Sequence, residues 1–198
     1  MICEPTDTPR LSDADIAALR ARYYAERDKR KNTKGGAQYI NDGPGDLHDL
    51  YNHDPYMPVA PRDPIVEDLD VAVLGAGFSG VMASYYLKQE GLTNFRNIDH
   101  AGDFGGVWYW NRYPGIQCDN ESYCYLPLLE ETGFMPSRRF APGPEIMGYI
   151  RLIAEKNGFA GNALFHTLIT SLVWDESIQR WRISTDRGDE LLARHVIM

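Results

Sequence analysis

The sequence predicts an α/β protein with a parallel central sheet, preceded by a helical and irregular N-terminal extension. An apolar stretch from Leu69 leads into a glycine turn and then into a helical pattern that ends at Gly91. A second predicted strand, FRNID at 95–99, follows at once. This strand, helix, strand order is typical of parallel strands joined by a crossover helix. From residue 163 the apolar pattern changes to a period of about two, which predicts a small antiparallel β element.

The extension is expected to contain one amphipathic helix. Ser12 is followed three residues later by Asp15, and apolar residues then recur near helical spacing as far as Arg30. The basic run RDKRK at 27–31 suits the end of this helix, because cations favour helix C-termini. From Asn32 onward Gly, Pro, Asn and Asp dominate, so an extended arm over the domain is expected. The predicted division is therefore 1–68 for the helix and arm and 69–198 for the domain that contains the sheet.

The second half of the chain is predicted to form one further helix and several short strands. The stretch 144–158 has helical spacing with Pro144 in its first turn. The strands are expected in ALFHTLIT, SLVWDE, RWRISTD and LLARHVIM, with turns at Ser177 and Gly188.

Composition limits the class of partner and the compartment. The 198 residues are 43% hydrophobic, which is ample for a packed core, and the formal charge of −8 argues against a nucleic-acid partner. No stretch reaches the roughly 20 apolar residues of a membrane span, and the first thirty residues lack the apolar core of a signal peptide. A cytoplasmic protein with free thiols is expected. The three cysteines and five histidines show no metal-ligand spacing.

A glycine motif carries the main functional prediction. Gly75, Gly77 and Gly80 form GxGxxG in GAGFSG, after an apolar strand and at the start of a helix, and Asp99 ends the next strand 22 residues beyond Gly77. In a Rossmann-like fold these glycines allow a tight turn, close approach of a pyrophosphate and close helix packing, and the acid binds a ribose. The alternative is a glycine turn that binds nothing. The motif suits FAD or NAD better than NADP.

The run GGVWYWNRYPG at 105–115 raises the question of what so many aromatic side chains do in one loop. A second glycine pair would let another backbone segment approach the cofactor, and the aromatics would shield a flavin from water. Alternatively they are core or interface residues, which is the favoured interpretation for Tyr109 taken alone. Taken together, and next to a dinucleotide-binding fold, these aromatic residues favour FAD over NAD as the cofactor.

Four stretches together resemble one protein family. GAGFSG, the acid at Asp99, GGVWYWNRYPG and CDNESYCYLPLLEE are similar to the FAD-binding half of the class B flavoprotein monooxygenases, the Baeyer-Villiger monooxygenases. The run QCDNESYCYLPLLEETG resembles the branch that acts on large cyclic ketones or steroids. The resemblance implies an enzyme with the cofactors FAD and NADPH that uses O2 to convert a ketone substrate into an ester or lactone.

The resemblance also implies roles for individual residues. Asp119 matches an acidic residue near the flavin that orients a catalytic arginine, and it is the one catalytic candidate. The cofactor-binding candidates are Gly75, Ala76, Gly77, Phe78, Ser79, Gly80, Asp99, His100, Gly106, Val107, Trp108, Gln117, Cys118, Asp119, Tyr125 and Ile169. Among them, Gln117 and Cys118 match the approach of the nicotinamide nucleotide, and Ile169 matches an apolar residue beside the adenine.

Two departures from the family pattern limit this prediction. The ribose acid is Asp99, whereas the family more often has Glu, so its hydrogen bonds could be longer or bridged by water. The chain also ends before a second GxGxxG domain, the fingerprint FxGxxxHxxxW and the arginine partner of Asp119. A fragment that is inactive by itself is therefore expected. The alternatives are a related flavin monooxygenase acting on amines or sulfides and a non-enzymatic nucleotide-binding module.

The remaining histidines and cysteines are expected to be structural. Four histidines are expected to be surface residues or buried residues with hydrogen-bond partners: His48, His53, His166 and His195. His100 is kept as a candidate because it follows Asp99. Cys118 and Cys124 could form a redox pair, although free thiols are the simpler interpretation.

Overall fold

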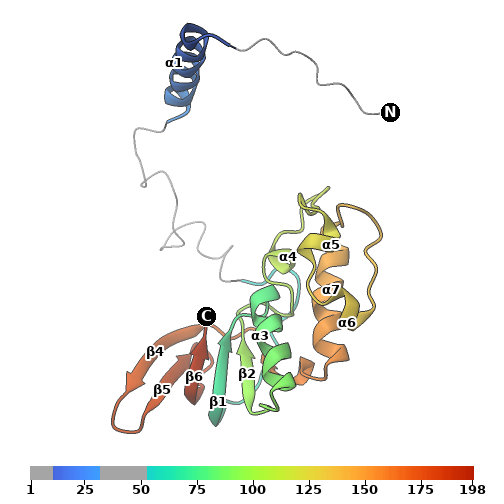
Figure 1. The fold of residues 1–198 in the computed structure, drawn as a ribbon. Coiled ribbons are helices and arrows are strands. Elements are labelled where there is room, and N and C mark those ends of the chain that lie inside the picture. Colours follow the sequence, from blue (N-terminus) through green and yellow to red (C-terminus); the bar gives the residue numbers. More distant parts are fainter. Residues whose placement is uncertain (1–10, 32–52) are drawn as a thin grey trace. The chain divides into compact units, whose positions relative to one another are not determined.

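The computed structural model describes residues 11–31 and 53–198, which fall in two compact units divided after Asn52 (Figure 1). Most of the predicted extended arm, from 32 to 52, lies outside the described residues.

The first unit contains one helix, α1 (Asp13–Arg30), as predicted. Ser12 caps it reciprocally: the Asp15 amide donates to Ser12 Oγ at 3.2 Å, and the Ser12 amide donates to Asp15 Oδ2 at 3.1 Å. Basic residues occupy the last turn, which confirms that the basic run ends the helix. No residue of α1 is buried.

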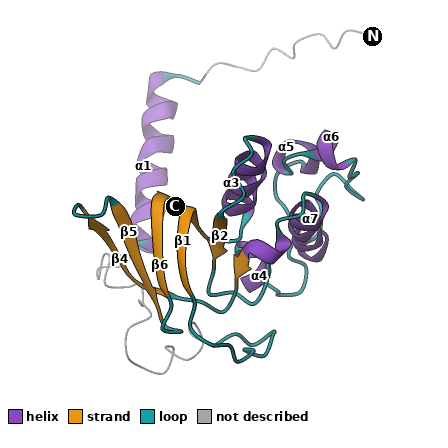
Figure 2. Ribbon diagram, turned by 90° about the horizontal axis from the view of Figure 1, so that it is seen from below, coloured by secondary structure: helices purple, strands orange, loops and turns teal. Residues whose placement is uncertain are grey.

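The second unit is built on one six-stranded sheet, in the order β3-β2-β1-β6-β5-β4 (Figure 2). Its strands are β1 (Val66–Leu74), β2 (Phe95–Ile98), β3 (Ala163–Leu164), β4 (Ile169–Asp175), β5 (Arg180–Thr185) and β6 (Glu190–Ile197). β1 pairs in parallel with β2 and β6, and β2 with β3, whereas β4, β5 and β6 are antiparallel neighbours. The predicted parallel sheet and antiparallel element are confirmed as parts of a single mixed sheet.

The predicted strand ALFHTLIT is wrong as a single element. β3 ends at Leu164, and β4 starts at Ile169 and continues through the next predicted strand to Asp175. Between them His166 has a φ of 48°, which breaks the extended conformation. Period-two patterning does not detect this break, because it depends on which residues are apolar and not on the backbone conformation of a single residue.

Two long helices cover one face of the sheet. They are α3 (Phe78–Gln89) and α7 (Gly143–Lys156), with Pro144 in the first turn of α7 as predicted. Val71 and Val73 of β1 join Ile146 and Ile150 of α7 in the larger core cluster. Short elements complete this side: α4 (Val107–Trp110), α5 (Ser122–Tyr125), α6 (Leu129–Thr132) and η2 (Ala160–Asn162). A second cluster packs around Leu69, Ala72, Ile183, Leu191 and Ala193.

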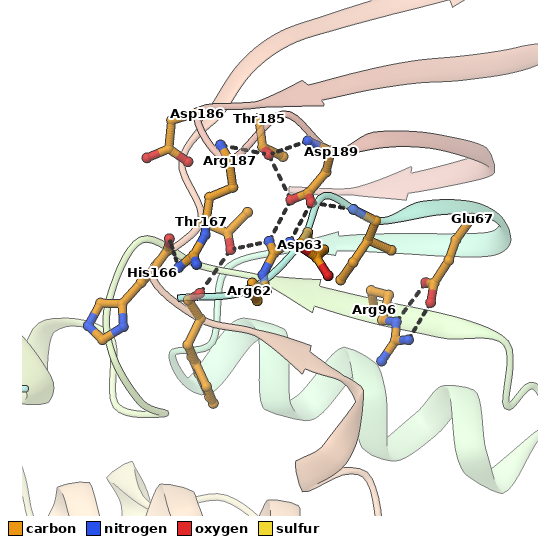
Figure 3. A network of polar contacts seen from close by, with 12 residues as sticks. Arg62, Asp63, Glu67, Arg96, His166, Thr167, Thr185, Asp186, Arg187 and Asp189 are labelled. Carbon is orange, nitrogen blue, oxygen red and sulfur yellow. Dashed lines mark hydrogen bonds and ion pairs between the residues drawn. The ribbon is translucent and has the colours of Figure 1, made fainter. Parts of the chain in front are cut away.

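A buried ion pair fastens the segment before β1 to the hairpin between β5 and β6 (Figure 3). Arg62 donates two hydrogen bonds to Asp189, at 2.5 and 2.6 Å, and the Asp189 carboxylate is fully buried. The same carboxylate accepts from the Ile65 amide at 2.8 Å and from Thr185 Oγ1 at 2.7 Å. Every oxygen of the buried acid is thus compensated, which is the condition for such a pair to be stable.

Replacing Asp189 with Asn is expected to destabilise the chain at neutral pH and to remove part of its acid sensitivity. The hydrogen bonds from Arg62 lower the pKa of Asp189 from 3.8 to about 2, against the opposing effect of burial. A pKa lowered by folding stabilises the native state above the ordinary pKa, and this stabilisation is lost as the pH falls from about 4 to about 2. The shift corresponds to about 2 kcal/mol.

Urea unfolding at pH 7 and at several values down to pH 2 measures this effect. The exposed neighbour substitution Asp63→Asn serves as the control, because it removes the same charge outside the ion pair. An Asp189→Asn chain as stable as the Asp63→Asn chain at pH 7 contradicts the assignment.

Candidate functional site

The glycine turn joins β1 to α3 and has the conformation that its sequence predicts. Gly75 has a φ of 117°, a backbone conformation that residues other than glycine rarely adopt. Its amide donates to the Ile98 carbonyl at 2.8 Å, so the turn starts level with the end of β2. A Cβ atom on Gly80 would lie 2.1 Å from the Gly75 carbonyl oxygen. Glycine at position 80 is therefore required for the helix to pack against the turn.

The second glycine pair packs directly against the first turn. A Cβ on Gly106 would lie 2.8 Å from the Gly77 Cα, and one on Gly77 would lie 3.3 Å from the Gly106 Cα. The Gly105 amide donates to the Ala76 carbonyl at 3.0 Å. Gly77 thus allows the approach of another backbone segment of this chain, a reason for glycine that the motif alone does not reveal. Its predicted contact with a pyrophosphate stays a prediction.

Asp99 lies beside this turn at the end of β2. Its Oδ2 accepts from the Ala76 amide at 2.7 Å, and its Oδ1 accepts from the Ala101 amide at 2.9 Å. Each carboxylate oxygen keeps a further lone pair for a ligand. His100 follows Asp99 and stacks on Trp110 with a ring-centroid distance of 4.6 Å, so the aromatic run contacts the residue next to this acid.

The start of α3 can accept an anion. Gly77 is the N-cap residue, and no side chain caps this end of the helix. The first amides of a helix have no partner within it, and the helix dipole makes this end positive. The turn, the acid and the uncapped helix end therefore meet at one place, which is the arrangement that binds the diphosphate and ribose of a dinucleotide.

A buried polar pair under the turn was missed by the sequence analysis. Asn97 of β2 is fully buried, and its side-chain amide donates to the carbonyls of Gly75 at 3.2 Å and Gly80 at 3.3 Å. Ser84 Oγ donates to Asn97 Oδ1 at 2.8 Å and lies at the same distance from the Gly80 carbonyl. The pair fixes the distance between the two ends of the glycine motif. The available signal was the polar residue at position 97, between Phe95 and Ile98 in a short predicted strand.

Three predicted cofactor residues come together behind the turn. Trp108 Nε1 donates to the Tyr125 hydroxyl at 2.9 Å, and the Phe78 and Tyr125 rings meet edge to face at 5.5 Å. Trp108 also lines a cavity of about 560 Å³ between the aromatic loop and the start of α7, with Tyr113 and Met147 on its walls. This volume is within the range of small-molecule sites.

Tyr109 and Arg112 serve a different purpose from Trp108. Tyr109 is fully buried, which confirms the core interpretation of this residue, and its hydroxyl donates to Asp54 Oδ2. The Arg112 guanidinium lies 3.8 Å from the Tyr56 ring centroid and 4.6 Å from that of Tyr109. These cation–π contacts join the aromatic loop to the segment before β1.

The other candidates are more scattered. Val107, Gln117 and Asp119 are exposed, Cys118 is buried, and Ile169 starts the edge strand β4. Within 11–31 and 53–198 no ion pair involves Asp119 and no cluster could hold a metal ion. The roles assigned to these residues stay predictions. No helix in the described part of the chain is long and apolar enough to cross a membrane.

Comparison with known proteins agrees with this geometry. Residues 73–132 match the family model described as an NAD(P)-binding Rossmann-like domain. Baeyer-Villiger monooxygenase 4 of Dietzia sp. (strain D5) is 46% identical over 92% of this chain, which covers 29% of that protein. The polycyclic ketone monooxygenase of Thermothelomyces thermophila superposes with a TM-score of 0.82 and 32% identity, over 93% of this chain and 32% of that one. OTEMO in complex with FAD and NADP gives a TM-score of 0.61 at 30% identity, over 65% of this chain and 25% of that one.

The fold and the turn define a protein of the dinucleotide-binding Rossmann-like class. Within that class, the chain is similar over more than nine-tenths of its length to one part of the Baeyer-Villiger monooxygenases. It spans about 30% of the length of the curated relatives it matches.

Replacing Asn97 with Leu is expected to destabilise the second unit by about 1–3 kcal/mol, because the Gly75 and Gly80 carbonyls lose their buried donor. Ser84→Ala removes the other member of the pair. Chemical unfolding of both single variants and of the double variant forms a double-mutant cycle. Strict additivity of the two effects contradicts a shared polar cluster.

Proposed function

We propose that this chain is the FAD-binding part of an NADPH-dependent flavin monooxygenase that inserts oxygen into ketones to give esters or lactones. One observation carries the proposal: the uncapped start of α3 lies beside Asp99 and against the Gly105–Gly106 turn. The names of the relatives support the ketone substrate. The cofactors are supported by the structural neighbour OTEMO, whose structure is a complex with FAD and NADP.

The residues around the glycine turn fit the diphosphate and the ribose of FAD. The amides at the start of α3, from Gly77 to Gly80, would hold the pyrophosphate, and the carboxylate of Asp99 would accept from the ribose hydroxyls. Trp108, Tyr125 and Phe78 would lie along the flavin and keep water from it. Bound FAD supplies the redox chemistry that takes a hydride from NADPH and activates O2.

The candidates between Gln117 and Asp119 suit the flavin and nicotinamide end of the proposed site, away from the ribose. Asp119 is exposed and would orient a cation that stabilises negative charge developing on the substrate. Gln117 and Cys118 precede it on the same stretch and would face the nicotinamide nucleotide. We assign the NADPH domain and most of the ketone pocket to parts of the relatives that this chain does not cover.

Further parts of the proposal concern the whole protein. We place it in the cytoplasm and propose a helix and arm at 1–68 before a domain at 69–198, a division that falls within β1. The segment 53–65 nevertheless belongs to the same compact unit as the sheet. Amine or sulfide oxidation is the second candidate reaction, and a non-enzymatic nucleotide-binding module is the third.

Gly77→Val is expected to abolish FAD binding. The branched side chain would meet the Gly106 backbone and occupy the place proposed for the pyrophosphate. Titration of the purified chain with FAD, followed by quenching of flavin fluorescence, gives the dissociation constant. Gly161→Ala is the control, because a Cβ at that position meets nothing within 4 Å. A Gly77→Val chain that binds FAD like the control disproves the assignment.

Asp99→Ala is expected to weaken FAD by about 1–3 kcal/mol, the range for losing a hydrogen bond to a charged group. The conservative variant Asp99→Asn keeps one acceptor oxygen and is expected to lie between the wild type and Asp99→Ala. Both are measured in the same fluorescence titration. Equal dissociation constants for all three chains mean that another residue binds the ribose.

A further inference from the structure

We infer that the segment from Asp54 to Arg62, here called the strap, positions the FAD site although it contributes no residue to the glycine turn. The inference rests on the proposed function and concerns Asp54 as a positioning residue. At Asp54 the strap is attached to the aromatic run and to the loop between β3 and β4. At Arg62 it is attached to the same loop and to the turn between β5 and β6. Each attachment uses a buried carboxylate.

The first attachment is centred on Asp54, which is only 7% exposed. Its Oδ2 accepts from the Tyr109 hydroxyl and lies 2.8 Å from His166 Nε2. Its Oδ1 accepts from the amides of Tyr56 at 2.8 Å and Met57 at 3.3 Å. One carboxylate therefore joins the strap, the aromatic loop and the loop between β3 and β4.

The protonation states suit this arrangement. Burial raises the pKa of Asp54, but the hydrogen bonds from Tyr109, Tyr56 and His166 outweigh it and leave the pKa below its ordinary value. Burial, followed by the hydrogen bond to Asp54, raises the pKa of Tyr109. The proton stays on the tyrosine and the charge on the carboxylate, so the bond between them is charge-assisted.

The second attachment uses Arg62, which binds Asp189 and also donates to Thr167 Oγ1 at 3.2 Å (Figure 3). Thr167 follows His166, so both attachments act on the same loop. The strap is also held in its middle, where Arg187 donates to the Ala60 carbonyl at 2.7 Å.

The held loop contacts the loop of the ribose acid. The Thr167 amide donates to the Asp99 carbonyl at 3.0 Å, and the His166 amide donates to the Ala101 carbonyl at 2.9 Å. The Ala101 amide in turn donates to Asp99 Oδ1 at 2.9 Å. A continuous set of hydrogen bonds thus runs from Asp54 to the carboxylate proposed to bind the ribose.

Gly102 is the point at which this set can be disturbed selectively. A Cβ at that position would lie 2.6 Å from His166 Nε2, 2.7 Å from Asp54 Oδ2 and 2.7 Å from the Tyr109 hydroxyl. All three neighbours belong to the first attachment, and none belongs to the glycine turn. Alanine at 102 would therefore separate the three polar groups without substituting any residue proposed to contact FAD.

The test compares Gly102→Ala and Tyr109→Phe with the wild-type chain. Tyr109→Phe removes one hydroxyl and keeps the buried ring, so it covers the case in which Gly102→Ala does not fold. Gly161→Ala is the matched glycine control. FAD dissociation constants are measured well below the unfolding temperature of each apo chain, where a loss of global stability alone does not change them. Amide hydrogen exchange of residues 99–102 is measured in parallel.

We expect at least a tenfold weaker FAD affinity for Gly102→Ala, a smaller loss for Tyr109→Phe, and faster exchange at 99–102 in both. Gly161→Ala is expected to match the wild type. Wild-type FAD affinity in the folded variants overturns the inference, and so does weaker affinity with unchanged exchange at 99–102. A wild-type chain that binds no FAD would instead refute the proposed function, so the two failures are distinct.

Discussion

Close packing of three backbone segments at the glycine turn is the constraint on which the rest of the structure depends. Gly80 brings α3 against the Gly75 carbonyl, and Gly77 brings the Gly106 backbone against the same turn. A side chain at position 80 or 106 would force the segments apart, which would move the start of α3 away from Asp99 and the aromatic loop away from Tyr125. The positions of Asp99, Trp108 and Tyr125 relative to one another therefore depend on contacts that only glycine permits.

The order and type of the main elements could be predicted because local signals determine them. The capping box of α1, Pro144 in the first turn of α7 and the strand, turn, helix sequence around Gly77 all act over a few residues. The joining of all strands in one sheet could not be predicted. It depends on parallel pairing of β1 with β6, which lie more than a hundred residues apart, and no local pattern records such a pairing.

The candidate site shows the same division between local and distant information. The glycines and Asp99 could be found because their spacing along the chain reflects one βαβ unit. Asp54 and His166 could not, because 112 residues separate them and each alone resembles an ordinary polar residue. Asn97 lies between these cases. A polar side chain on the buried face of a short strand indicates a buried hydrogen-bonding partner. Only the fold shows that its partners are the carbonyls of the glycine turn.

The aromatic run is explained by the directions in which its side chains point. Trp108 points toward Tyr125 and the proposed flavin wall, whereas Tyr109 points toward Asp54. Trp110 stacks on His100, which follows Asp99. Successive residues of one helical turn point about 100° apart, so a four-residue helix such as α4 can serve several neighbours at once. The aromatic loop therefore contacts both the glycine turn and the strap. A strand would have placed its aromatics on only two faces.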